Sequence, residues 1–205
     1  MHQISPISVT MKSSKRRELE FNKPLIMGIL NLTPDSFYDG GKYSLSLEVA
    51  INRVKEMIMQ GADIIDIGAA SSKPGATIID PLEEQSRLIP FFEAIRNKFP
   101  DIWISIDTYH SLTAEICLEK GADIINDISA GNIDERIFEV VGKFKCPYVL
   151  MHMQGIPGNM QLDPQYKNIV EEIISFFKNK MESLNKYGVS KIILDPGFGF
   201  GKTLD

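Results

Sequence analysis

The sequence predicts an α/β protein of the TIM-barrel class, a (β/α)8 barrel of which this chain holds about six of the eight βα units. Six short apolar runs recur along the chain, nearly continuous in Ile, Leu, Val and Met, as in strands buried on both faces of a parallel sheet. Amphipathic segments separate the runs. A polar residue lies at or near the end of each run, in the order Asn31, Asp66, Asp107, Asn126, His152 and Asp195.

Each predicted strand is followed by a predicted helix or by the start of one. The strands are expected at residues 25–32, 63–68, 102–108, 123–128, 147–153 and 191–197. The helices are expected at residues 46–60, 81–99, 111–120, 134–144 and 165–187. Asp80 is a candidate N-cap for the second helix and Pro81 suits its first turn. Gly61, Gly121 and Gly188 can end three of the others.

An internal echo supports a repeated βα unit. The sequence Gly-Ala-Asp-Ile-Ile-Asp at residues 61–66 returns as Gly-Ala-Asp-Ile-Ile-Asn at residues 121–126. Each copy joins a helix end to a strand. A doubly wound sheet would more often show a glycine-rich first turn, which does not follow the first run. In a barrel, polar residues at the carboxyl ends of the strands form the active face.

Composition limits the functional classes. The 205 residues carry a formal net charge of −5, and 43% are hydrophobic, as in an ordinary globular domain. We therefore expect neither a nucleic-acid partner nor a membrane partner. Two cysteines, Cys117 and Cys146, form no disulfide framework, so we expect a cytoplasmic protein in which both thiols pack in the core.

We expect two segments along the chain, a flexible leader at residues 1–22 and a barrel at residues 23–205. The basic cluster at residues 12–17 fits a transit-peptide fragment or a surface patch, and a solvated leader is the simpler interpretation.

Two long loops follow the first and second strands. Residues 28–41 contain two carboxylates, aromatic side chains and a Gly-Gly pair, and residues 68–76 are rich in Ser, Gly and Pro with one lysine. Such residues are common in simple capped turns. On the active side of a barrel, however, organised loops of this length are more often functional.

In these two loops and at the strand ends, the sequence resembles the dihydropteroate synthases. Asn-Leu-Thr-Pro-Asp-Ser-Phe-Tyr-Asp-Gly-Gly at residues 31–41 is similar to their first signature loop, and Ser-Ser-Lys-Pro-Gly-Ala at residues 71–76 is similar to their second. Asp-Thr, Ile-Asn-Asp, Met-His-Met-Gln-Gly and Asp-Pro-Gly-Phe-Gly-Phe-Gly-Lys follow in the family's order. The resemblance implies condensation of 6-hydroxymethyl-7,8-dihydropterin pyrophosphate with p-aminobenzoate, giving 7,8-dihydropteroate and pyrophosphate. It also implies a homodimer.

The resemblance assigns roles to particular residues. The residues that it implies for pterin binding are Asp107, Asn126, Ile128, Met151, Asp195 and Phe200. Those implied for the p-aminobenzoate slot, together with Phe200, are Phe37, Ser72 and Pro74. Asp39 and Asp35 would stabilise a cationic pterin methylene, Lys73 would meet the pyrophosphate, and Asn31 would bind Mg2+. His152 fits a structural role as well as a site role, and Asp66 and Asp127 fit structural roles.

The second loop departs from the family, which usually has Gly-Gly-Glu-Ser-Thr-Arg-Pro-Gly. Ala70 replaces the glutamate and Lys73 replaces the arginine, so a charge and a bidentate donor are lost. Two alternatives therefore stay open: a pterin-dependent methyltransferase-like barrel and a pterin-binding protein without catalysis.

Residues 196–203 resemble a nucleotide-binding P-loop, but Pro196 stands where the pattern needs glycine. Lys202 in this segment also fits an ordinary solvated lysine.

The chain stops before the seventh and eighth βα units that the resemblance implies. We expect the isolated chain to fold poorly or to dimerise, with little activity, because an open sheet exposes its edges. A cooperative thermal melt of the monomer together with normal turnover would contradict this expectation.

Overall fold

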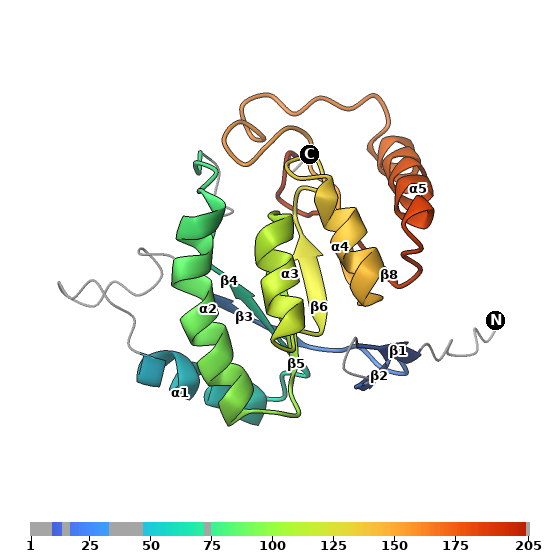
Figure 1. The fold of residues 1–205 in the computed structure, drawn as a ribbon. Coiled ribbons are helices and arrows are strands. Elements are labelled where there is room, and N and C mark those ends of the chain that lie inside the picture. Colours follow the sequence, from blue (N-terminus) through green and yellow to red (C-terminus); the bar gives the residue numbers. More distant parts are fainter. Residues whose placement is uncertain (1–9, 14–16, 33–46, 72–74, 204–205) are drawn as a thin grey trace.

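The computed structural model describes residues 10–13, 17–32, 47–71 and 75–203. Its centre is a six-stranded sheet in which every strand pairs with the next strand along the chain (Figure 1). The strands are β3 (Met27–Asn31), β4 (Ile64–Gly68), β5 (Trp103–Asp107), β6 (Ile124–Asp127), β7 (Tyr148–Met151) and β8 (Ile192–Asp195). All five pairings are parallel. The predicted α/β class and its six strands are confirmed, and β3 and β8 form the edges of this sheet in the described part of the chain.

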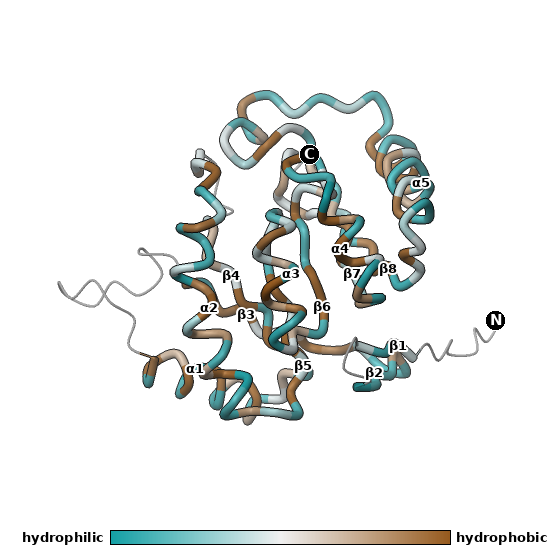
Figure 2. Tube along the Cα trace, in the orientation of Figure 1, coloured by the Kyte–Doolittle hydropathy of each residue, from teal (hydrophilic) through white to brown (hydrophobic). Residues whose placement is uncertain are grey.

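Five helices connect the strands and cover the outer face of the sheet. They are α1 (Leu47–Met59), α2 (Pro81–Lys98), α3 (Ser111–Glu119), α4 (Arg136–Phe144) and α5 (Ile169–Lys186). Along the helices, hydrophobic and hydrophilic residues alternate (Figure 2). The hydrophobic side packs on outward-facing strand residues such as Ile65, Ile104 and Ile106, which are fully buried in one core. The Asp80 side chain accepts the Leu82 N–H at 2.8 Å, so the predicted N-cap is confirmed.

The last helix begins four residues later than the sequence pattern predicts. Asn168 is its N-cap, and the carboxylate of Glu172 accepts the N–H groups of Lys167 and Asn168 at 2.7 and 3.1 Å. These bonds satisfy backbone donors that would otherwise lack partners at the start of a helix. Residues 165–167 therefore belong to the connection from β7, which arches over the end of the sheet where the C-terminus lies (Figure 1).

A short ribbon precedes the sheet in sequence. Strands β1 (Thr10–Lys12) and β2 (Glu18–Glu20) pair antiparallel. Between them, Arg17 reaches Asp123 of the barrel, with 2.7 Å between Nε and Oδ1. The division of the chain at residue 22 stays a prediction, but Arg17 is bonded to the body of the protein.

Asp123 is the centre of a buried ion cluster. Its side chain is fully buried and binds Arg17, Arg96 (2.6 Å) and the backbone N–H of Ile104 (3.0 Å). Nη1 and Nη2 of Arg17 and Nη1 of Arg96 donate to backbone carbonyls that include those of Pro100, Gly121 and Ile102. Nε of Arg96 is buried and has no hydrogen-bond partner among the described residues. This cluster joins the N-terminal segment, α2 and the start of β6.

The internal echo in the sequence corresponds to a repeated bonding pattern. Asp63 accepts the N–H of Ile26 at 2.9 Å through its side chain, and its own N–H donates to the Ile26 carbonyl at 2.8 Å. Asp123 makes the equivalent two bonds with Ile104, at 3.0 and 2.9 Å. Each aspartate therefore ties the start of its own strand to the preceding one, and only the copy at residue 123 is buried.

The cysteines lie in the core on the outer side of the sheet. Cys117 and Cys146 are free thiols, and both are buried among the apolar residues under the helices. Burial raises the pKa of both, that of Cys146 to about 12. Among the described residues, no helix combines the length and the apolar character that crossing a bilayer requires.

Candidate functional site

The inner face of the sheet changes from apolar to polar along each strand. Near the amino-terminal ends of the strands, this face holds a buried cluster of Ile64, Trp103, Ile124 and Val149. Met27 and Ile193 pack against this cluster. Side chains two or four positions further along a strand point the same way. The inner face at the carboxyl ends therefore holds Asn31, Asp66, Gly68, Asp107, Asn126, Met151 and Asp195.

Strand register brings the predicted pterin-binding residues together. Asp107 of β5 pairs directly with Asn126 of β6 on one side and with Gly68 of β4 on the other. Met151 of β7 pairs with Asp195 of β8. The two aspartates and Asn126 thus lie on one inner face, at the carboxyl ends of three separate strands.

Asn126 is held by a residue that the sequence analysis treated as structural. Its Nδ2 donates to Oδ2 of Asp66 at 3.2 Å, whereas its Oδ1 is buried and has no hydrogen-bond partner among the described residues. A buried acceptor without a partner is costly, and a bound ligand donor would remove that cost. Burial raises the pKa of Asp66, and the side chains of Ser105 and Asn126 offset this only in part.

Asp107 carries the strongest electrostatic perturbation in this group. Asp107 is half-buried. Its partial removal from water, together with the neighbouring carboxyl groups of Asp66, Glu84 and Asp127, raises its pKa well above the usual value of 3.8. A perturbed acid beside an unpartnered amide oxygen is typical of a functional site.

An apolar layer adjoins this polar row. Its buried members come from the end of β7 and from the loops after β5, β6 and β7, and three partly buried residues pack against them. They are Tyr109, Ile128, Met151, Met153 and Met160, with Ala70, Ile133 and Phe200 against them. Ile128, Met151 and Phe200, all predicted to contact pterin, therefore share one cluster. Polar groups beside an apolar surface suit a flat heterocycle with a hydrogen-bonding edge.

The loop after β6 is fixed by Asp127. This buried carboxyl group accepts the N–H groups of Ser129 and Gly131 and the hydroxyl of Tyr148, each at 2.7 Å. Burial nevertheless raises its pKa. These three hydrogen bonds give Asp127 the structural role that was expected for it. The loop that it holds in place carries Ile128.

The loop after β8 encloses a lysine. Lys202 Nζ donates to the carbonyls of His152, Gly197 and Phe200 at 3.0–3.2 Å and lies 3.0 Å from His152 Nδ1. Lys202 is therefore partly exposed but hydrogen-bonded within this loop, not a freely solvated lysine. Because carbonyl oxygens here surround a cation, the segment is not the ring of N–H groups that a phosphate needs. His152, whose ring also contacts Phe176, has a structural role in this loop.

One other predicted residue lies on an edge strand of the sheet, and the rest lie outside the described part of the chain. Asn31 ends β3 on the inner face and is exposed. The described residues contain no cluster of three His, Cys, Asp or Glu side chains that could hold a metal. The remaining predicted residues, namely Asp35, Phe37, Asp39, Ser72, Lys73 and Pro74, lie outside the described residues.

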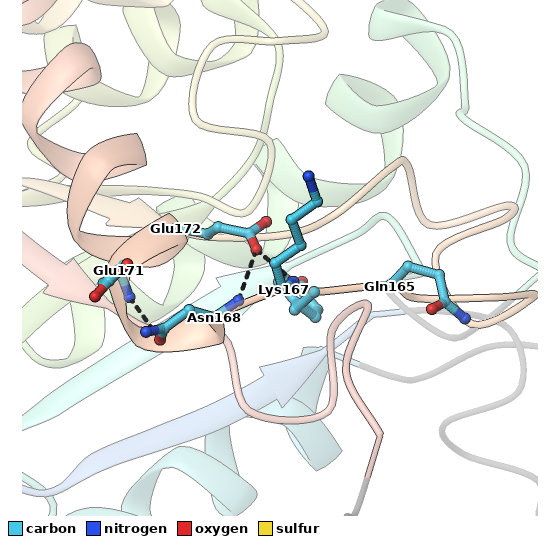
Figure 3. A pocket seen from close by; sticks show the side chains of 6 residues that line it. Gln165, Lys167, Asn168, Glu171 and Glu172 are labelled. Carbon is cyan, nitrogen blue, oxygen red and sulfur yellow. Dashed lines mark hydrogen bonds between the residues drawn. The ribbon is translucent and has the colours of Figure 1, made fainter.

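An open pocket of about 710 Å3 lies at the start of α5. Its lining residues mainly cap the helix: Glu172 accepts two backbone N–H groups, and the Glu171 N–H donates to the Asn168 side chain (Figure 3). Protein groups already occupy the helix N-terminus, so this pocket offers no free anion site.

Comparison with known proteins agrees with this geometry. Residues 27–205 match the family described as pterin binding enzyme. The dihydropteroate synthase of Synechocystis is 44% identical over 182 residues, which cover 88% of this chain and 62% of the relative. The chain thus spans less than two thirds of that relative.

Solved structures of the same kind are similar over nearly the whole chain. Yersinia pestis dihydropteroate synthase in a sulfonamide drug complex superimposes with a TM-score of 0.86 at 39% identity, covering 96% of this chain and 70% of that one. Xanthomonas albilineans dihydropteroate synthase with 4-aminobenzoic acid gives a TM-score of 0.85 at 34% identity, covering 96% and 69%.

Proposed function

Since this chain belongs to the pterin-binding enzyme family, we propose that it supplies the pterin-binding part of a dihydropteroate synthase. The reaction joins the amine of p-aminobenzoate to the methylene carbon of 6-hydroxymethyl-7,8-dihydropterin pyrophosphate. The C–O bond to pyrophosphate breaks, pyrophosphate leaves with the bonding electrons, and the amine loses a proton. The products are 7,8-dihydropteroate and pyrophosphate.

The observation that carries this proposal is the pairing of Asp107 with Asn126 beside the apolar layer. The 2-amino-4-oxo edge of a pterin presents adjacent N–H donors, which an ionised carboxylate can accept together. The unpartnered Oδ1 of Asn126 offers one more acceptor. Asp195 would complete the edge contacts, and Ile128, Met151 and Phe200 would cover the ring.

The chemistry at the mouth of the barrel rests on the two long loops. Asp39 and Asp35 would stabilise positive charge on the pterin methylene as pyrophosphate leaves. Phe37, Ser72 and Pro74 would complete the slot for p-aminobenzoate, and Lys73 would meet the pyrophosphate. Exclusion of water by these loops would protect the cation from hydrolysis.

Asn31 could bind Mg2+ only if the substrate supplied further ligands to the ion. A single amide oxygen fits an ion that keeps several waters and takes the rest of its ligands from phosphate oxygens. Asn31 would hold Mg2+ through its amide oxygen, and the ion would supply positive charge that neutralises the leaving pyrophosphate.

A pyrophosphate-release assay tests the proposal. We expect release that requires both the pterin pyrophosphate and p-aminobenzoate, with little release by this chain and more by the chain extended by two further βα units. Pterin binding without release in both forms would select the non-catalytic alternative. Binding of methyltetrahydrofolate without p-aminobenzoate turnover would select the methyltransferase alternative.

Gly68 provides a test of the pocket's geometry. A Cβ placed at residue 68 would lie 3.0 Å from Asp107 Oδ2 and 3.1 Å from its Cβ. We expect Gly68→Ala to displace the Asp107 carboxylate and to weaken pterin binding about tenfold, measured by quenching of pterin fluorescence. Gly158→Ala is the control, because its Cβ would meet only Ala76 O at an ordinary 3.5 Å. Equal affinity of the two variants would argue against Asp107 as a pterin ligand.

We further propose a homodimer in the cytoplasm. Two free buried thiols suit a reducing compartment, and the dimer follows from the family resemblance. Light scattering of the protein after gel filtration tests the assembly, and a monomer at micromolar concentration would contradict it.

A further inference from the structure

Glu84 is a buried acid outside the barrel's inner face. It lies in α2, its side chain is fully buried, and no ion pair among the described residues includes it. Burial raises its pKa. An apolar residue would pack between α2 and the sheet at lower cost, so the hydrogen bonds of Glu84 need an explanation.

The partner of Glu84 is Thr108, the residue directly after Asp107. The Thr108 hydroxyl donates to Glu84 Oε2 at 2.8 Å. The same hydroxyl oxygen accepts the N–H of His110 at 3.1 Å. Because both hydrogen-bonding directions of this hydroxyl are in use, the conformation of the chain just beyond Asp107 is fixed.

Thr108 also joins the two strands that carry the polar pair. Its backbone N–H donates to the carbonyl of Asn126 at 3.0 Å, continuing the pairing of β5 with β6 beyond Asp107. A contact from α2 thus reaches the two strand ends on which Asp107 and Asn126 stand.

We propose that Glu84 is a positioning residue for pterin binding, which acts through Thr108 to hold Asp107 and Asn126 in register. This inference rests on the proposed function. Glu84 itself touches no substrate. It would keep the acceptor groups of Asp107 and Asn126 at the separation that one edge of a heterocycle requires. A small displacement of either group would lower the affinity for the ligand.

Four single variants test the proposal by pterin affinity. We expect Glu84→Leu and Thr108→Val each to weaken pterin binding about tenfold, because each removes the bond between α2 and the strand end. Glu84→Gln keeps an acceptor for Thr108, so we expect its pterin affinity to lie within about threefold of that of the unmodified protein. Thr113→Val is the matched control: Thr113 is also fully buried and its side chain also acts on Glu84, but it is in α3 and does not follow a pterin-binding residue. This variant keeps the bond between Glu84 and Thr108, so we expect its pterin affinity to stay within about threefold of the unmodified protein.

A double-mutant cycle separates positioning from general loss of structure. In a protein that already carries Asp107→Asn, we expect Glu84→Leu to weaken pterin binding by less than about threefold, because one of the two acceptors that Glu84 positions is gone. If Glu84→Leu does not fold, Thr108→Val replaces it in the cycle. Equal losses with and without Asp107→Asn would overturn the proposal, as would full affinity in Thr108→Val. Absence of pterin binding in the unmodified protein would instead refute the proposed function.

Discussion

Replacing Asp107 by asparagine is expected to weaken pterin binding by about two orders of magnitude. The change removes charge-assisted bonds to the ligand, and the new amide places a donor opposite the pterin's own donors. Together the two effects are worth about 3 kcal/mol, and about 1.4 kcal/mol corresponds to tenfold. Titration of pterin fluorescence measures the loss. Asp101→Asn, at an exposed carboxylate, is the control.

The stability of the same variant relative to the unmodified protein should increase as pH rises. The folded-state pKa of Asp107 is well above its usual value of 3.8, so the folded protein holds this proton more tightly than the unfolded chain. The stabilisation is complete below 3.8 and is lost as pH rises through the folded-state pKa. Asparagine does not ionise, so Asp107→Asn should gain stability over the unmodified protein towards neutral pH. Denaturant unfolding at several pH values tests this, and a constant difference would contradict the buried-acid interpretation.

Pterin affinity of the unmodified protein should change with pH in the opposite sense. Pterin N–H donors favour the ionised carboxylate, so affinity should increase as pH rises through the elevated pKa of Asp107. Asp107→Asn should lack this increase, because its side chain carries no proton to lose. Near neutral pH, Asp107 would therefore destabilise the free protein but increase its affinity for pterin. Such a trade-off between stability and binding is common at binding sites.

Asp123→Ala is expected to lower the free energy of unfolding by about 3–5 kcal/mol. It would leave the guanidinium groups of Arg17 and Arg96 without their carboxylate and the Ile104 N–H without its acceptor. Urea denaturation followed by circular dichroism measures the change.

Asp63→Ala is the matched control for this variant, because Asp63 holds the equivalent place in the echoed βα unit. Its side chain is 26% exposed and its pairing with Lys23 is long, at 3.7 Å. We expect a loss of about 1 kcal/mol. If both variants lost the same amount, the stabilising role of the cluster around Asp123 would be refuted.

The sequence predicted the ends of the strands and helices to within two residues, except at the start of α5. Buried parallel strands are apolar on both faces, so runs such as residues 102–108 and 123–128 are visible without tertiary information. The start of α5 was misplaced because residues 165–167 fit the helical pattern, whereas capping by Asn168 and Glu172 fixes the true start.

The site was predictable where chemistry follows strand ends and unpredictable where it depends on contacts from other elements. Asp107 and Asn126 close their strands and were identified on that ground. Glu84 is adjacent to Glu83 in the same helix turn, and no sequence pattern separates the buried acid from the exposed one. Likewise, nothing local shows that Lys202 turns inward, because its carbonyl partners include one that lies 50 residues earlier.

The buried state of the two cysteines has a practical consequence for labelling. Alkylating dyes react with the thiolate, and both thiols are sequestered with elevated pKa values. A maleimide applied to the folded protein at neutral pH should therefore leave both unmodified. A single exposed substitution, such as Glu182→Cys on α5, would then carry the dye alone, and no native cysteine would need to be removed.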